Sequence, residues 1–124
     1  SDTAKENDKG SKVLDEALKQ MNEYFSGKRK IFDLPLHFEG TEFQKSVWNE
    51  LRKIPYGITV SYKDIAEGIN NEKAVRAVGN ANNKNKIMII VPCHRVIGKN
   101  GKLVGFAGGL DKKEFLLEHE KKFM

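Results

Sequence analysis

Pro92-Cys93-His94-Arg95-Val96 is the stretch on which the fold and the chemistry of this chain depend. Directly before it, residues 87–91 form an apolar run, Ile-Met-Ile-Ile-Val, whose β-branching predicts a short buried strand or extended segment. Pro92 ends that segment, because proline lacks the amide donor that a sheet requires. The pattern therefore indicates that Cys93, the only cysteine, stands at the end of a rigid segment with His94 beside it.

A lone Cys-His pair supports two interpretations about equally. Most free cysteines are small buried hydrophobic residues. A thiol next to a base is also the arrangement that activates cysteine nucleophiles. Neighbours in sequence often point apart, so the rest of the chain has to distinguish the two.

Composition limits the class of protein. A chain of 124 residues forms one domain with a modest core. A single cysteine excludes an internal disulfide and a cysteine-rich zinc site, which favours a reducing, intracellular setting. No apolar run approaches the roughly 20 residues of a membrane helix, and no signal-peptide pattern opens the chain. We therefore expect a cytoplasmic protein without a membrane segment or a metal.

The net charge of +5 is concentrated around the Cys-His pair. Residues 61–102 carry eight Lys or Arg against three Asp or Glu, whereas residues 1–40 carry seven against eight. A polyanion, nucleic acid first, is the natural partner of such a region. A basic surface that only aids solubility is the alternative on charge alone.

The first half of the chain predicts an arm and two helices. Residues 1–12 are polar and predict a disordered arm. Residues 13–25 have apolar side chains at helical spacing and end at Ser26-Gly27, before an extended connector over 31–36. Thr41 and Gln44 form a capping box that opens a helix to about Lys53. Its expected buried residues are Phe43, Val47, Trp48, Leu51 and Ile54.

Two short helices follow. Ser61 and Asp64 cap the first, over 62–68, and the second runs over 72–81. In the second helix we expect Ala74, Val75 and Val78 to face inward and Arg76 and Asn80 to face outward. Two such helices joined by a tight turn suggest a helix-turn-helix, which also occurs in purely structural roles. The small residues Ala77, Gly79 and Ala81 would let the second helix lie close to a DNA groove.

The C-terminal part predicts a hairpin and a last helix. Asn100-Gly101 is a hairpin signal, from which residues 102–104 return into a glycine-rich loop over 105–109. Asp111 and Glu114 are expected to cap a helix over 112–123, on which Leu116, Leu117 and Glu120 share one face. A carboxylate on an inward face needs a partner, and His94 is the candidate.

Taken together, these motifs resemble the O6-alkylguanine-DNA alkyltransferases. The resemblance rests on residues 40–44 (Gly-Thr-Glu-Phe-Gln), 55–57 (Pro-Tyr-Gly), 61–62 (Ser-Tyr), 76–79 (Arg-Ala-Val-Gly), Asn85, 92–96, 108–110 (Gly-Gly-Leu) and 116–120 (Leu-Leu-Glu-His-Glu). It covers nearly everything from residue 13 onward. The resemblance implies direct-reversal DNA repair, in which the alkyl group of O6-alkylguanine, and of O4-alkylthymine, moves once to a cysteine of the protein, without a cofactor.

The resemblance also implies residue roles. Cys93 would accept the alkyl group, His94 would act as a base through a water, and Glu120 would orient that histidine. Asn85 would brace the active-site turn, and Tyr62 would donate a proton or hydrogen bond to the departing guanine. The carbonyls of Cys93 and Val96 and the amide of Ala107 would line the base pocket, beside Phe106, which stands where some relatives have tyrosine.

For DNA, the resemblance implies a monomer bound in the minor groove of double-stranded DNA with the damaged guanine flipped out. Arg76 would fill the space that the base leaves. The other implied contacts are Ala77, Gly79, Asn80, Ala81, Tyr62 and Arg95. Flipping is required because a thiolate cannot reach an alkylated oxygen inside the base stack.

The expected fold is α+β and mostly helical, with a winged-helix-like helix-turn-helix domain over 40–124. Residues 13–39 would be the helix and connector left from a larger N-terminal domain that family members carry. Three other functions compete: a DNA-binding relative that senses alkylation without repair, a regulator with a sensing cysteine, and a cysteine hydrolase. The acceptor cysteine argues against the first, the Asn85 and Glu120 matches favour transfer chemistry over the second, and a basic helix-turn-helix does not suit the third.

Overall fold

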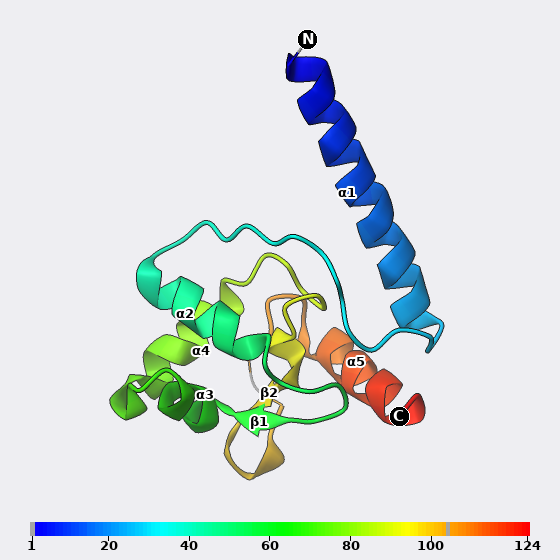
Figure 1. Cartoon of the computed structure of the whole chain (residues 1–124). Helices are drawn as coiled ribbons and strands as arrows, with labels where there is room; N and C mark the ends of the chain where they lie inside the picture. Colours follow the sequence, from blue (N-terminus) through cyan, green and yellow to red (C-terminus); the bar gives the residue numbers. More distant parts are fainter. Residues whose placement is uncertain (1, 104) are drawn as a thin grey trace. The chain divides into compact units, whose positions relative to one another are not determined.

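The computed structural model describes residues 2–103 and 105–124, and the chain divides into two compact units, Ser1–His37 and Phe38–Met124 (Figure 1). From the sequence we expect this boundary between residues 39 and 40. In the first unit, helix α1 spans Asp2–Phe25. The expected disordered arm is therefore helical from Asp2 onward, because residues 2–12 lack proline and continue the backbone hydrogen bonding of the amphipathic part.

Helix α1 ends where the sequence predicts. Gly27 has a φ of 78°. Its amide donates to the carbonyl of Tyr24, and the amide of Lys28 donates to the carbonyl of Glu23. This pair of bonds is a Schellman motif, which glycine makes without strain. The following connector has no regular secondary structure but is tied to the helix, since the Gln20 side chain bonds to both backbone groups of Asp33.

The second unit starts with helix α2, Glu42–Leu51, whose Thr41–Gln44 capping box is present in both directions. Its buried face consists of Val47, Trp48 and Leu51, as predicted, with Ile54 buried beyond its end. Phe43, also expected to be buried, is half-buried. The Trp48 indole donates a hydrogen bond of 2.9 Å to the carbonyl of Ala81 on another helix. The core of this unit is thus built partly by the contact of α2 with α4.

Helices α3 and α4 pack against each other and against α2. Helix α3 spans Tyr62–Gly68 and has the predicted Ser61–Asp64 capping box. The next helix begins as a 3₁₀ turn, Glu72–Ala74, and continues as α4, Val75–Asn83. The prediction for Val75 was wrong, because its side chain is 38 % exposed and Val78 alone of the two valines is buried. The 3₁₀ start rotates the face of the helix relative to an uninterrupted α-helix.

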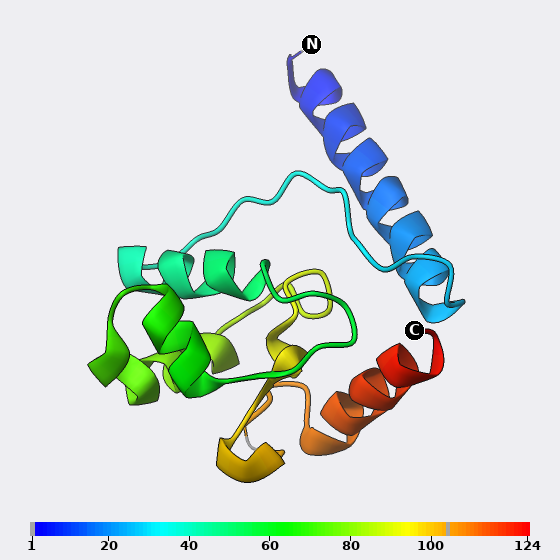
Figure 2. The ribbon, with the colours of Figure 1, turned by 60° about the horizontal axis from the view of Figure 1, so that its bottom comes forward.

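A two-stranded parallel sheet lies between this helical group and the last helix (Figure 2). Strand β1, Val60–Ser61, pairs with β2, Val96–Ile97, with Val60 opposite Val96. A 3₁₀ turn over Cys93–Arg95 precedes β2, and a second one over Lys99–Gly101 follows it. The expected hairpin is only this turn, closed by the Gly98 amide on the Lys102 carbonyl, and Val104 lies outside the described residues.

Helix α5, Leu110–Lys122, completes the unit. It begins earlier than expected, with Gly109 at the N-cap position and no side-chain cap, so the predicted caps Asp111 and Glu114 lie inside the helix. Gly109 has a φ of 100°, which only glycine adopts readily, and this backbone turn sets the helix start. Leu116 and Glu120 are buried on α5, as predicted, and Leu117 is half-buried.

Candidate functional site

The apolar run 87–91 forms a tight turn and not the predicted strand. The amide of Val91 bonds back to the carbonyl of Ile87, and that of Ile90 to the carbonyl of Met88. Between them Ile89 has a φ of 75°, which is costly for a β-branched residue. The β-branched composition misled the prediction because tertiary and side-chain contacts override strand propensity here.

Asn85 holds this turn together. Its side-chain amide donates a 2.9 Å hydrogen bond to the carbonyl of Val91, and its side-chain oxygen accepts one of 3.0 Å from the amide of Ile87. Asn85 is itself buried, with an exposed fraction of 4 %. Asn85 therefore bridges the two ends of the turn that delivers Cys93.

Cys93 lies at the start of the 3₁₀ turn and is 2 % exposed. Its amide bonds to the carbonyl of Val91 at 2.8 Å, so the turn and the thiol are directly linked. Burial raises the pKa of Cys93, and a hydrogen bond with Asn85 and the charge of Lys113 only partly oppose that shift. The resting group is thus a protonated thiol that needs a base before it can attack.

His94 and Glu120 meet as the sequence predicted. Nε2 of the imidazole lies 2.6 Å from Oε2 of Glu120, and both side chains are buried. Nδ1 of His94 is also buried, and no described residue pairs with it. If Nε2 carries the proton towards the carboxylate, Nδ1 is left as a proton acceptor.

The pKa of His94 is lowered from its ordinary value by burial, despite the opposing effect of Glu120. Burial alone would raise the pKa of Glu120, but hydrogen bonds from His94 and Arg95 hold it well below its usual range. At neutral pH the pair is therefore a neutral imidazole beside a carboxylate, the state in which a histidine can act as a base.

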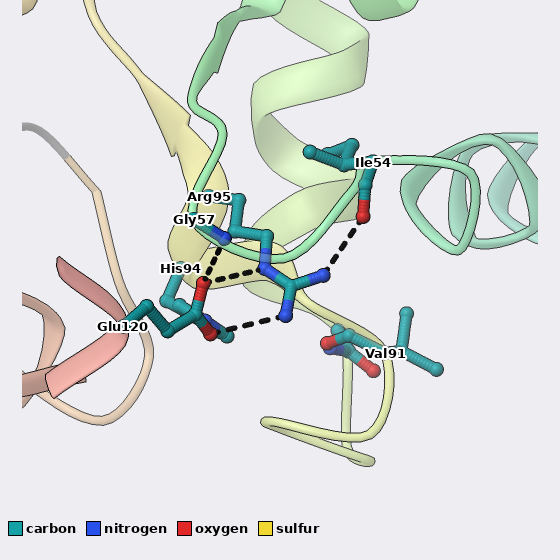
Figure 3. Close-up of polar contacts among 7 residues, drawn as sticks. Ile54, Gly57, Val91, His94, Arg95 and Glu120 are labelled. Atoms are coloured by element: carbon teal, nitrogen blue, oxygen red, sulfur yellow. Dashed lines mark hydrogen bonds and ion pairs between the residues drawn. The ribbon is translucent and has the colours of Figure 1, made fainter. Parts of the chain in front are cut away.

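Glu120 has two further partners (Figure 3). Arg95 donates from Nε to Oε1 at 2.9 Å and from Nη2 to Oε2 at 3.0 Å, and the amide of Gly57 donates to Oε1 at 3.0 Å. Arg95 is 6 % exposed and also donates to the carbonyl of Ile54 at 2.8 Å. The expectation that Arg95 contacts DNA is corrected, because its guanidinium is committed inside the protein.

Lys113 on α5 is a site residue that the sequence analysis missed. It is fully buried, and its ammonium donates to the carbonyl of Val96, with a longer contact of 3.3 Å to the carbonyl of Gly105. The Val96 carbonyl, expected to line the base pocket, therefore already has a donor. Burial lowers the pKa of Lys113, and the proximity of Cys93 opposes that shift.

Tyr62, the first residue of α3, approaches the same site from the other side. Its hydroxyl lies 3.5 Å from the carbonyl of Gly105. Burial and then the charge of Cys93 raise its pKa, while a hydrogen bond with Asn82 lowers it. Tyr62 and Asn85 thus both interact with the Cys93 side chain, and His94, the next residue in the chain, pairs with Glu120. The five predicted catalytic residues come from α3, the 85–95 segment and α5.

The residues expected to touch DNA divide into two groups. On α4, Arg76, Ala77 and Asn80 are exposed and Gly79 is half-buried, so all four are accessible. Ala81 is 3 % exposed and its carbonyl holds the Trp48 indole, so the prediction that it contacts DNA is corrected. In the expected base pocket, Phe106 is half-buried and Ala107 is exposed.

Two other features bear on the class of site. Within residues 2–103 and 105–124, no three His, Cys, Asp or Glu side chains gather in a way that could hold a metal ion. In the same part of the chain, every helix is too short or too polar to cross a bilayer.

Comparison with known proteins adds a family match. Residues 42–122 match the family model described as "6-O-methylguanine DNA methyltransferase, DNA binding domain". The methylated-DNA–protein-cysteine methyltransferase of Methanosarcina acetivorans is 65 % identical over 105 residues, which is 85 % of this chain and 67 % of that protein. The chain spans about two thirds of the length of the curated relatives it matches.

Solved structures of similar proteins are consistent with the family match. The Mycobacterium tuberculosis OGT in complex with DNA is 52 % identical with a TM-score of 0.86, covering 88 % of this chain and 68 % of that one. Atl1 of S. pombe, in complex with damaged DNA containing O6-carboxymethylguanine, is 29 % identical with a TM-score of 0.60, covering 68 % and 80 %. Both are similar to this chain in fold, and both titles name DNA as the bound partner.

Proposed function

Because the chain belongs to the methylated-DNA–protein-cysteine methyltransferases, a family of DNA-repair transferases, we propose that it carries the alkyl group of O6-alkylguanine in DNA to its own Cys93. At up to 65 % identity to its relatives, the chain is a methyltransferase that repairs DNA by alkyl transfer. The observation that carries the residue assignment is the buried Cys93 held on the Asn85-braced turn, next to the His94–Glu120 pair.

The first step activates the thiol. His94 takes the proton of Cys93 at Nδ1 through a bridging water, and the resulting imidazolium is stabilised by Glu120 at Nε2. The buried pair makes this transfer feasible, since Glu120 is already charged before the proton arrives. Asn85 and the charge of Lys113 favour the thiolate as it forms.

The second step breaks the bond to the base. The Cys93 sulfur attacks the alkyl carbon and an S–C bond forms. The bond between the alkyl carbon and O6 breaks, and its electron pair stays on the guanine. Tyr62 supplies the proton that the departing guanine ring needs, and the phenolate is reprotonated from the proton held on His94 through solvent. The products are a thioether at Cys93 and an unmodified guanine, and no cofactor enters the balance.

DNA binding falls to α4 in this proposal. The accessible small residues Ala77 and Gly79 let the helix approach the minor groove, and Asn80 and Arg76 are exposed beside them. Arg76 occupies the space left in the stack by the flipped nucleotide. The arrangement of α3, the 3₁₀ turn and α4 serves as a helix-turn-helix, although the minor groove offers little base-specific information.

A thioether is a poor leaving group and Cys93 is the only cysteine, so each molecule reacts once. We propose that the protein acts as a monomer inside the cell, where DNA is its substrate. O4-alkylthymine is included as a second substrate because it presents an equivalent exocyclic oxygen to the sulfur.

The deciding experiment is incubation with a duplex containing O6-methylguanine, followed by mass spectrometry of the peptide that contains Cys93. The expected result is one added methyl group on that cysteine and none in the matched Cys93→Ala protein. The Cys93→Ala protein should bind the duplex within a few fold of the parent. Binding without methylation of the parent would instead favour a DNA-binding sensor of alkylation damage.

A further inference from the structure

Arg95 belongs to the 92–96 motif, and its guanidinium bonds to groups inside the protein (Figure 3). One side chain joins the segment that follows α2, through the Ile54 carbonyl, to the carboxylate of Glu120 on α5. Glu120 is also the partner of His94. Resting on the proposed function, we propose that Arg95 is a positioning residue of alkyl transfer, which fixes the shared Glu120 carboxylate and limits how strongly it draws His94 towards the charged form.

The geometry of Glu120 supports the fixing role. Oε1 accepts from Arg95 Nε and from the amide of Gly57, and Oε2 accepts from Arg95 Nη2 and faces His94 Nε2. The planar guanidinium matches both oxygens at once, so the carboxylate cannot rotate without breaking two charge-assisted bonds. His94 consequently meets one oxygen at one angle, which keeps its proton on Nε2 and its acceptor on Nδ1.

The charges around His94 support the limiting role. Glu120 and Lys113 face it from α5, Arg95 and the Cys93 thiol flank it in the chain, and Tyr56 lies beside the Arg95–Glu120 pair, with its ring 5.6 Å from the guanidinium. Of these, only Glu120 draws a proton onto the imidazole, and Arg95 and Lys113 oppose it. Without Arg95, the full charge of the buried carboxylate would act on His94, which would then spend more time protonated and unable to accept a proton.

A purely structural brace would predict something different. If Arg95 only tied the segment after α2 to α5, its removal would lower stability and reduce transfer equally at every pH. If Arg95 sets the protonation state of His94, its removal moves the acidic limb of the pH–rate profile, where the transfer rate falls as the pH drops, to higher pH. The pH profile therefore separates the two roles.

The test compares the parent with two variants. Arg95→Met keeps an unbranched aliphatic side chain without the charge, and Arg95→Lys keeps the charge without the planar guanidinium that binds both carboxylate oxygens. Single-turnover transfer from a free O6-alkylguanine base is measured from about pH 5 to about pH 8, where histidine changes charge. The free base removes DNA contacts from the comparison. Arg52→Met is the matched control, because Arg52 is an exposed arginine at the C-cap of α2.

For Arg95→Met we expect the acidic limb to move to higher pH, and the imidazole of His94, followed by NMR, to titrate at higher pH than in the parent. For Arg95→Lys we expect the limb to stay in place while the plateau rate falls, by up to roughly 100-fold for a misplaced group. Arg52→Met should match the parent in both. An unchanged limb and an unchanged His94 titration in a folded Arg95→Met protein would overturn the inference.

Removing one partner of a buried ion pair destabilises a protein, so circular dichroism must confirm that each variant is folded. If Arg95→Met does not fold, Arg95→Lys decides: a shifted limb or an unchanged plateau rate would refute the proposal. Failure of the proposed function is recognised separately. In that case the parent would leave Cys93 unmodified, while the titration of His94 would still report on Arg95.

Discussion

Alkylation of Cys93 should destabilise the protein that carries it. Cys93 is 2 % exposed, so a new methyl group on its sulfur must enter packed space at the end of the strained turn. Overpacking of this kind costs about 1–3 kcal/mol. The His94–Glu120 and Arg95–Glu120 contacts do not include the sulfur, so they survive, and only the hydrogen bond with Asn85 is lost in addition, at about 1 kcal/mol.

The loss should appear as a lower melting temperature of the unit over residues 38–124. For a domain of that size each kcal/mol lowers Tm by about 4–8 °C. The combined loss of about 2–4 kcal/mol therefore predicts a fall of roughly 8–32 °C. The assay is calorimetry before and after reaction with one equivalent of O6-methylguanine duplex, once the DNA product is removed. Protein treated with unmethylated duplex, and Cys93→Ala treated with methylated duplex, are the controls and should not change.

Larger alkyl groups sharpen the test. An O6-benzylguanine adduct should lower Tm more than a methyl adduct, because more volume enters the same packed site. An unchanged or raised Tm after complete methylation would show that the site has room for the group and would refute the packing argument.

Three further outcomes are expected. Tyr62→Phe removes the hydroxyl and keeps the ring, so single-turnover transfer should slow by roughly 100-fold or more while DNA affinity in a gel-shift assay stays the same. Arg76→Ala should slow transfer from duplex DNA more than from the free base, because only the duplex needs a flipped nucleotide, which costs a few kcal/mol; equal losses would exclude that role. Stability measured by urea unfolding should fall as the pH drops below 6.5, because the pKa of His94 is lowered by burial and the unfolded chain takes up that proton first. It should fall further below pH 4.5, where the unfolded chain protonates Glu120 and the folded one does not, whereas Glu67→Gln, at an exposed carboxylate, should leave this profile unchanged.

The sequence predicted best the features that depend on neighbouring residues. Both capping boxes and the glycine end of α1 involve groups within a few positions of one another, and all three are present. The His94–Glu120 pair was also predicted, although the two lie far apart in sequence. There the reason was chemical, since a carboxylate on the inward face of a helix requires a buried partner.

Features that depend on which partner a side chain bonds to were predicted poorly. Residues 87–91 have the composition of a strand, but the two-way bonding of the Asn85 side chain closes them into a turn and forces Ile89 to positive φ. The expectation that Arg95 contacts DNA came from the family resemblance and not from its neighbours in sequence. Nothing local indicates that the Glu120 carboxylate of α5 and the Ile54 carbonyl, both distant in sequence, meet its guanidinium.

The burial of Lys113 could have been predicted from its spacing in the sequence. It lies three, four and seven residues before Leu116, Leu117 and Glu120, which is the spacing of one helical face. A face that buries both a lysine and a glutamate cannot serve packing alone, because each charge must find a partner in the interior. Those partners are the Val96 carbonyl, beside the thiol, and His94. Helix α5 therefore places a positive charge near Cys93 and a negative charge against His94. The helical spacing of charged residues, and not only of apolar ones, indicates where this site lies.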